Sequence, residues 1–186
     1  MEFKEKFFDI TNLIQKEFDR NLGMYGDKIK CGRGCSECCS QIFSITSIDS
    51  FIILEHVHSL PSERQSQLKQ KAKDYLEKKA SEEEPNLKIP CPTLGDEGEC
   101  TIYEARPVIC RRFGMPIYDY KNPSNIHACH LNFEDGEEIV DAELIPNQTS
   151  IGVKWDELKE RFNEQKSPAE PPAKTTIADA ILTAFS

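Results

Sequence analysis

The chain has 186 residues, of which 38% are hydrophobic and 30% are charged, and its formal net charge is −9. This composition argues for a folded globular chain and against a disordered one. The negative charge argues against a nucleic-acid partner, because a phosphate backbone repels an acidic surface.

The first predicted element is an amphipathic helix. Apolar residues recur every three or four positions from Phe3 to Phe18, and the helix is expected to end near residues 21–23. The same stretch carries charges where a signal peptide needs an apolar core. The longest apolar stretches, such as residues 51–54, are too short to span a bilayer. We therefore expect a soluble, cytoplasmic protein with no membrane partner.

Two further helices are predicted after the first group of cysteines. Thr46 or Ser47 is a suitable N-cap for a helix that reaches about His58. Pro61 opens the next helix, whose apolar stripe could carry it to about Glu84. The outer face of this helix is highly charged, so we expect it at the surface.

The middle of the chain is predicted to be largely irregular. Residues 85–100 are expected to form a loop, because three prolines and two glycines interrupt them. Pro107 opens a short helix within residues 101–113. Apolar patterns favour a strand around residues 115–118 and another at residues 139–145.

The last third of the chain predicts two helices joined by a linker. Trp155, Leu158 and Phe162 mark the first helix, residues 167–174 form a Pro-rich linker, and residues 177–185 form a last short amphipathic helix. Together these elements predict a mainly α fold with irregular cysteine-rich loops, in which a small α+β arrangement is also open, organised as a metal-stabilised single domain. We divide it into an N-terminal helix that packs on the domain (1–24), a cysteine-cluster metal-binding domain (25–135), an acidic segment with a helix (136–166), and a Pro-rich linker with a C-terminal helix (167–186).

Four of the eight cysteines lie within the nine residues CGRGCSECC: Cys31, Cys35, Cys38 and Cys39. Two glycines argue against a helix in the first half of this stretch, so we predict a loop that leads into a helix near Cys35. The last three thiols would then converge at positions i, i+3 and i+4. A disulfide between the adjacent cysteines would be a strained ring, whereas metal binding needs only that thiolates approach a common point.

The other four cysteines, Cys91, Cys100, Cys110 and Cys129, form a second block, in which three lie beside turn formers or helix ends. Because cytosolic thiols stay reduced, metal ligation is favoured over disulfides or buried redox thiols. Eight sulfurs can serve two four-thiolate sites, one dinuclear site with spare thiols, or one four-iron cluster with others. The spacing leaves these arrangements open.

The run Cys31-x3-Cys35-x2-Cys38-Cys39 resembles the signature of the YkgJ-type cysteine-cluster family, which is described as a zinc- or iron-chelating domain. The second block is also similar to that family, at Cys91, Leu94, Cys100, Ile102-Tyr103-Glu104, Arg106-Pro107, Cys110-Arg111-x-Phe113 and the trailing Cys129. The resemblance covers roughly residues 25 to 135 and implies chelated zinc or iron. A similar motif occurs in a flagellin lysine methylase in which an iron–sulfur cluster is implicated, which keeps iron open.

Two kinds of residue could support the thiolates. Arg106 and Arg111 could lie just outside the thiolate ligands and offset their negative charge, or they could bind an anionic substrate group. Arg112 is expected to be solvated. Either His127 or His130 could replace a thiol as a ligand.

These observations favour a cytosolic metal-binding protein that acts as a binding or interaction module. All eight cysteines are candidate ligands, zinc is the first choice of metal, and iron or an iron–sulfur cluster is the alternative. The expected partners are the metal ion and a protein or peptide. The alternative function is an iron–sulfur-dependent redox or protein-modifying enzyme, and an enzyme is the less favoured class because no phosphate loop, nucleophile elbow or zinc-protease motif is present.

Overall fold

A computed structural model of the chain describes residues 2–32, 34–81, 88–122, 126–134, 139–165 and 175–185. Its internal contacts divide the chain into two compact units, which we call unit 1 and unit 2. Unit 1 comprises Met1–Gly32 and Val108–Phe162, and unit 2 comprises Arg33–Pro107 and Asn163–Ser186. Each unit is therefore built from two stretches that are far apart in sequence. No helix in the described ranges has the length and hydropathy that crossing a membrane requires.

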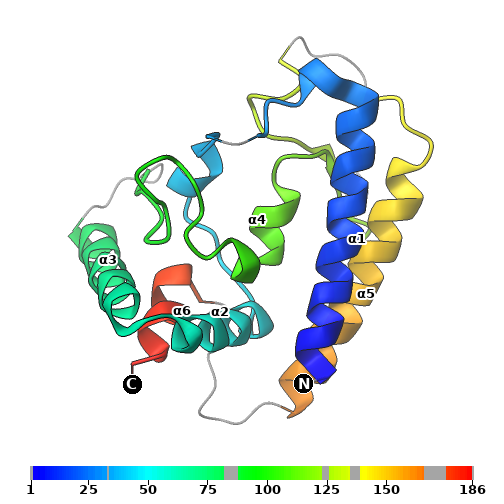
Figure 1. The fold of residues 1–186 in the computed structure, drawn as a ribbon. Helices are drawn as coiled ribbons and strands as arrows, with labels where there is room; N and C mark the ends of the chain where they lie inside the picture. The colour runs from blue at the N-terminus through cyan, green and yellow to red at the C-terminus, as the bar shows by residue number, and fades with distance from the viewer. Residues whose placement is uncertain are drawn as a thin grey trace. The chain divides into compact units, whose positions relative to one another are not determined.

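Unit 1 is built on two long helices that lie side by side (Figure 1). Its elements are α1 (Glu2–Tyr25), η1 (Gly26–Lys28), α4 (Val108–Arg112), β1 (Ile117–Tyr118), β2 (Ile126–His127) and α5 (Leu144–Gln165), the last turn of which passes into the second unit. The two short strands pair antiparallel, with Ile117 opposite His127 and Tyr118 opposite Ile126.

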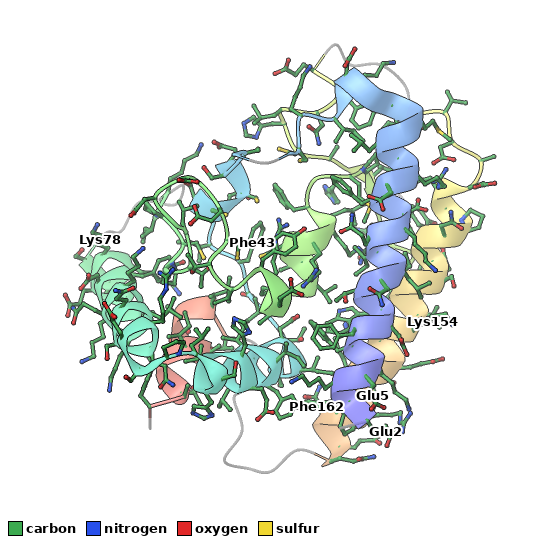
Figure 2. All side chains as sticks on the ribbon, in the orientation of Figure 1. Glu2, Glu5, Phe43, Lys78, Lys154 and Phe162 are labelled. Atoms are coloured by element: carbon green, nitrogen blue, oxygen red, sulfur yellow. The ribbon has the colours of Figure 1, made fainter. Side chains whose placement is uncertain are left out.

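Aromatic side chains join α1 to α5. The rings of Phe3 and Phe162 meet edge to face with centroids 5.2 Å apart, and those of Phe7 and Trp155 with centroids 6.1 Å apart. Figure 2 shows Phe162 beside the first turn of α1, where Glu2 is labelled. The helical spacing seen in both segments therefore marks the faces that pack together, and both predicted helices are confirmed.

Apart from the end of α5, the described residues of unit 2 form three α-helices and two single 3₁₀ turns. Its elements are η2 (Glu37–Ser40), α2 (Ser47–Ser59), α3 (Ser62–Ser81), η3 (Tyr103–Ala105) and α6 (Ile177–Thr183). The short helix α6 packs against both α2 and α3. Its residues Ala178, Ala180 and Ile181 are buried, so this C-terminal helix is part of the core of unit 2.

The starts of α2 and α6 use the same device. Thr46 and Thr176 each cap their helix, and an acidic residue three positions later, Asp49 or Asp179, bonds back to the capping threonine. The residues just before these caps, Ile45 and Thr175, exchange two backbone hydrogen bonds of 2.8 and 3.2 Å. The two helices therefore begin side by side, and the predicted cap at Thr46 is confirmed.

The structure confirms a mainly α fold with a small sheet, but it corrects two local predictions. Residues 139–143 form no strand. The Asp141 carboxylate accepts a hydrogen bond from the backbone N–H of Glu143, and the backbone carbonyl of Asp141 accepts one from the backbone N–H of Leu144, where α5 starts. Near Cys35 there is only the single 3₁₀ turn η2, rather than a helix. The linker predicted at residues 167–174 and the end of the helix predicted at 82–84 lie outside the described residues.

Candidate metal centre

The cysteines divide between the two units. Unit 2 contains Cys35, Cys38, Cys39, Cys91 and Cys100, and unit 1 contains Cys31, Cys110 and Cys129. All eight are described and none takes part in a disulfide. The two cysteine blocks of the sequence therefore do not correspond to the two units, because each unit contains cysteines from both blocks.

In unit 2, backbone contacts bring the two cysteine segments together. The backbone N–H of Cys91 donates to the carbonyl oxygen of Cys39 over 2.6 Å. Gly98 has φ +80°, and a Cβ atom built on it would lie 3.3 Å from the carbonyl oxygen of Gly34. Glycine at this position permits both the left-handed backbone and the close approach of one segment to the other. These contacts place cysteines more than fifty residues apart in one neighbourhood.

The second segment holds its cysteines on a tight loop. Leu94 and Cys100 form an isolated antiparallel bridge, and the backbone N–H of Gly95 donates to the carbonyl oxygen of Glu99 over 2.8 Å. The backbone N–H of Thr101 donates to the carbonyl oxygen of Thr93 at the same distance. Although the prolines exclude long regular structure here, the loop is thus closed by its own hydrogen bonds.

Four of the thiols in unit 2 fall into two pairs. The Thr93 hydroxyl lies 3.2 Å from the Cys91 sulfur and 3.7 Å from the Cys100 sulfur. The side chains of Cys38 and Cys39, on η2, are hydrogen-bonded to each other. Cys35 lies in the same segment, two residues before η2.

Hydrogen bonding, burial and neighbouring charges shift the pKa values of Cys38, Cys39 and Cys91. The hydrogen bond from Cys39 lowers the pKa of Cys38 to about 6, and the positive charge of Arg106 acts in the same direction. The pKa of Cys39 is raised by its bond to Cys38, by burial and by the nearby charges of Cys38, Cys91 and Cys100. Burial also raises the pKa of Cys91. A bound cation would favour the thiolate form of these cysteines, because each negative sulfur would then face a positive charge.

The donor set fits a thiophilic metal by its chemistry. Sulfur ligands select zinc, copper(I) or iron–sulfur clusters over hard cations. In the described ranges, however, no three Cys, His, Asp or Glu side chains are arranged so that they could hold an ion as they stand. The four thiols share a neighbourhood rather than a finished coordination sphere, so ion binding would turn side chains of the two pairs toward a common point.

The arginines differ in their surroundings. Arg106 lies in unit 2, bonds to Cys38 and stands 5.8 Å from the ring centroid of Tyr103. Arg111 is on α4 in unit 1, half-buried. The expectation that Arg112 is solvated is wrong: it is half-buried and donates to the buried Gln148 over 2.8 Å, and burial lowers its pKa.

In unit 1, the side chain of Cys31 lies against Asn132 and Gly114. The amide of Asn132 lies 3.6 Å from the Cys31 sulfur and also donates to the carbonyl oxygen of Gly114. A Cβ atom on Gly114 would overlap the Cys31 side chain, so any larger residue there would force the Cys31 sulfur to move. Cys129 is buried, and its carbonyl oxygen accepts the backbone N–H of Asn132. Cys110 is on α4, whereas His127 and His130 are both exposed.

Two residues near the unit 2 thiols were not identified from the sequence. Tyr75 on α3 lies close enough to Cys91 that burial and the thiolate charge raise its pKa to about 12. Its helical spacing indicated only a core position. Thr93 gave no signal at all, because its role depends on how the loop closes.

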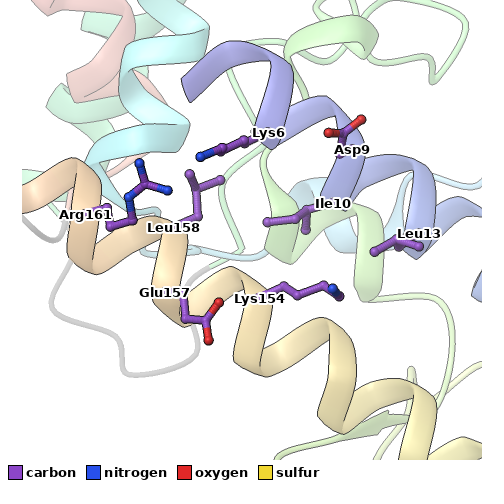
Figure 3. Close-up of a pocket in the computed structure, with 8 residues that line it drawn as sticks. All are labelled: Lys6, Asp9, Ile10, Leu13, Lys154, Glu157, Leu158 and Arg161. Atoms are coloured by element: carbon purple, nitrogen blue, oxygen red, sulfur yellow. The ribbon is translucent and has the colours of Figure 1, made fainter. Parts of the chain in front are cut away.

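A groove of about 290 Å³ lies between α1 and α5 in unit 1 (Figure 3). Ile10, Leu13 and Leu158 contribute its apolar lining, and charged side chains of both signs, among them Lys6 and Glu157, stand around it. It contains no cysteine, so it is separate from the thiols.

Comparison with known families agrees with the donor chemistry. Residues 30–131, more than half of the chain, match the model of the CxxCxxCC family, described as "Putative zinc- or iron-chelating domain". Neither the curated proteins nor the solved structures gave a match.

Proposed function

Because the chain belongs to the CxxCxxCC family of zinc- or iron-chelating domains, we propose that it is a metal-binding protein whose unit 2 holds an ion through thiolates. The proposed ligands are Cys38 and Cys39 on η2 and Cys91 and Cys100 on the loop that packs against it. The observation that carries this proposal is the 2.6 Å hydrogen bond from Cys91 to Cys39, which brings two remote thiol pairs into one neighbourhood.

Zinc is our first choice of metal. Four thiolates match a closed tetrahedral structural site, in which zinc–sulfur distances are about 2.3 Å. Such a site carries a net charge of about −2. Arg106, which bonds to Cys38, would offset part of that charge. Iron, as a single ion or a cluster, is the alternative, because it accepts the same ligands.

The other four cysteines stay candidate ligands: Cys35 in unit 2, and Cys31, Cys110 and Cys129 in unit 1. We propose that the unit 1 cysteines serve a second site, to which His127 or His130 could add a nitrogen ligand. Arg111 is proposed to neutralise charge there, next to Cys110 on α4.

We propose that this metal site makes the protein a cytoplasmic binding or interaction module. None of the eight cysteines takes part in a disulfide, which suits a reducing compartment. The net charge of −9 favours a protein or peptide partner over nucleic acid.

The test begins with elemental analysis and ultraviolet–visible absorption of air-free protein purified without added metal. Stoichiometric zinc in a colourless protein is expected, while stoichiometric iron with broad violet absorption would assign the same thiols to iron. Cys38→Ser and Cys100→Ser should each lose one ion per chain, because removal of a ligand opens the site.

Cys129→Ser is the matched control, since it changes a buried cysteine of unit 1. It should leave the unit 2 ion in place and remove only a unit 1 ion, so Cys38→Ser combined with Cys129→Ser should lose one ion more than Cys38→Ser combined with Cys100→Ser. Native protein without any transition metal, or full metal content in both unit 2 variants, would refute the proposal.

A further inference from the structure

Thr93 lies between two of the proposed ligands. Its hydroxyl oxygen is 3.2 Å from the Cys91 sulfur and 3.7 Å from the Cys100 sulfur, and the residue is only 3% exposed. Among the described residues, no other side chain is hydrogen-bonded to both of these sulfurs. Because little water reaches this position, the hydroxyl is a hydrogen-bond partner that solvent would not readily replace.

The backbone holds Thr93 in this place. Its carbonyl oxygen accepts two hydrogen bonds from Thr101, one from the backbone N–H at 2.8 Å and one from the side-chain hydroxyl at 2.9 Å. The bridge between Leu94 and Cys100 closes the loop next to it. The threonine side chain is therefore presented to the sulfurs by a fixed piece of backbone, which is what orienting a ligand requires.

A hydroxyl can serve both protonation states of the thiols. It has one proton to donate and two lone pairs that accept, so it can bridge two neutral thiols by accepting from one and donating to the other. Metal binding removes the thiol protons, and the hydroxyl is then left as a donor to sulfur. Hydrogen bonds to charged acceptors are the stronger ones, and donors to ligating sulfurs tune a metal centre.

We propose that Thr93 is a positioning residue of the unit 2 metal site, which orients the Cys91 and Cys100 sulfurs and donates a hydrogen bond from its hydroxyl to a ligating thiolate. This inference rests on the proposed metal-binding function. It assigns Thr93 a task within that site: to hold the Cys91 and Cys100 side chains beside its hydroxyl before the ion arrives, and to lower the electron density on sulfur afterwards.

The experiment measures cobalt(II) binding to air-free, metal-stripped full-length protein, in competition with a chelator of known affinity. Thr93→Val removes the hydroxyl at nearly constant volume and is expected to weaken cobalt(II) binding by about 10- to 100-fold. The sulfur-to-cobalt charge-transfer band should move to lower energy, because the thiolate loses a donor. Thr93→Ser keeps the hydroxyl and should restore both the affinity and the band position of the wild type.

Thr101→Val is the matched control. It makes the same change in the same loop, but the hydroxyl that it removes donates to the Thr93 carbonyl oxygen. A band at the wild-type position in Thr101→Val, with a shifted band in Thr93→Val, would support the inference. Equal loss of affinity in both variants without a band shift would mean that Thr93 only stabilises the loop, and would overturn it.

Two further outcomes are separable. Wild-type affinity and band position in Thr93→Val would also overturn the role of Thr93, while leaving the metal site intact. Failure of the wild-type protein to show any charge-transfer band would refute the metal-binding proposal itself, before a variant is compared. If Thr93→Val does not fold, as judged by circular dichroism, Thr93→Ala takes its place in the same comparison with Thr93→Ser.

Discussion

Arg20 joins α1 to the residues before α5 through two carboxylates in unit 1. Its guanidinium bonds to Glu17 over 2.6 and 2.9 Å and to both carboxylate oxygens of Asp141. The Asp141 side chain is 1% exposed, and the hydrogen bonds from Arg20 hold its pKa below the usual range for aspartate. Fork-shaped contacts between arginine and carboxylates combine charge with fixed geometry, so this cluster sets where α5 begins.

Asp141→Asn is expected to lower the free energy of unfolding at pH 7 by about 1.5 to 3 kcal/mol, because a charged hydrogen-bond acceptor is lost. A carboxylate with a depressed pKa stabilises the fold above its unfolded pKa of about 3.9 and loses this contribution as pH falls further. The variant should therefore lose less stability than the wild type below about pH 4. Urea unfolding at a series of pH values measures both effects.

Glu143→Gln is the control for this prediction. Glu143 is also near Arg20, but at 3.8 Å and with 71% of its side chain exposed. Its replacement should change stability by less than about 0.5 kcal/mol. An Asp141→Asn variant that keeps the acid sensitivity of the wild type would contradict the role assigned to Asp141.

Among the elements, α6 shows how a short helix becomes part of a core. It has only seven residues, Ile177–Thr183, too few to be stable alone in water. Its capping box and its contacts with α2 and α3 supply the stabilisation that so short a helix lacks on its own. The helix is thus stabilised mainly by tertiary packing.

Ile181→Ala is expected to destabilise unit 2 by about 2 to 5 kcal/mol, because the side chain is fully buried and its removal leaves a cavity. Ile145→Ala on α5 is the matched control, since that isoleucine is 48% exposed. Thermal unfolding followed by circular dichroism compares the two. Equal melting temperatures would show that Ile181 is not buried in the core of unit 2.

The sequence predicted individual helices well wherever one face of the helix is apolar. The helices from Phe3 and around Trp155 follow this rule, as does the capped start at Thr46. The strand predicted at residues 139–145 was wrong, because Asp141 accepts hydrogen bonds from the backbone N–H of Glu143 and from the remote Arg20 side chain. Local patterns carry no information about such remote partners.

For the whole molecule, the division into two units could not be predicted from spacing. The spacing of the first block predicted convergence only of Cys35, Cys38 and Cys39, and it left open how the eight thiols are shared. These three belong to unit 2, whereas Cys31 belongs to unit 1. The chemistry of the candidate site was readable from the residue types, whereas the grouping of Cys39 with Cys91 depends on backbone contacts across more than fifty residues. Whether all eight sulfurs bind metal stays a prediction.

Removal of the metal should affect the two units differently if the proposed site is correct. A strong chelator is expected to increase hydrogen exchange at the backbone amides of Cys91, Gly95 and Thr101, whose hydrogen bonds close the unit 2 loop. The amides of α1 and α5 should stay protected, and added zinc should restore the loop. Complete loss of metal without any change at these amides would contradict a role for the ion in ordering the loop.

The discontinuous make-up of unit 2 has a consequence for protein synthesis. During translation, all four proposed ligands leave the ribosome before α6, which completes the core around α2 and α3. The nascent chain therefore presents its thiols while that core is still open, and ion capture can precede the final closure. A pause in translation within α5 would prolong this exposed stage, when oxidation of the sulfurs competes with loading.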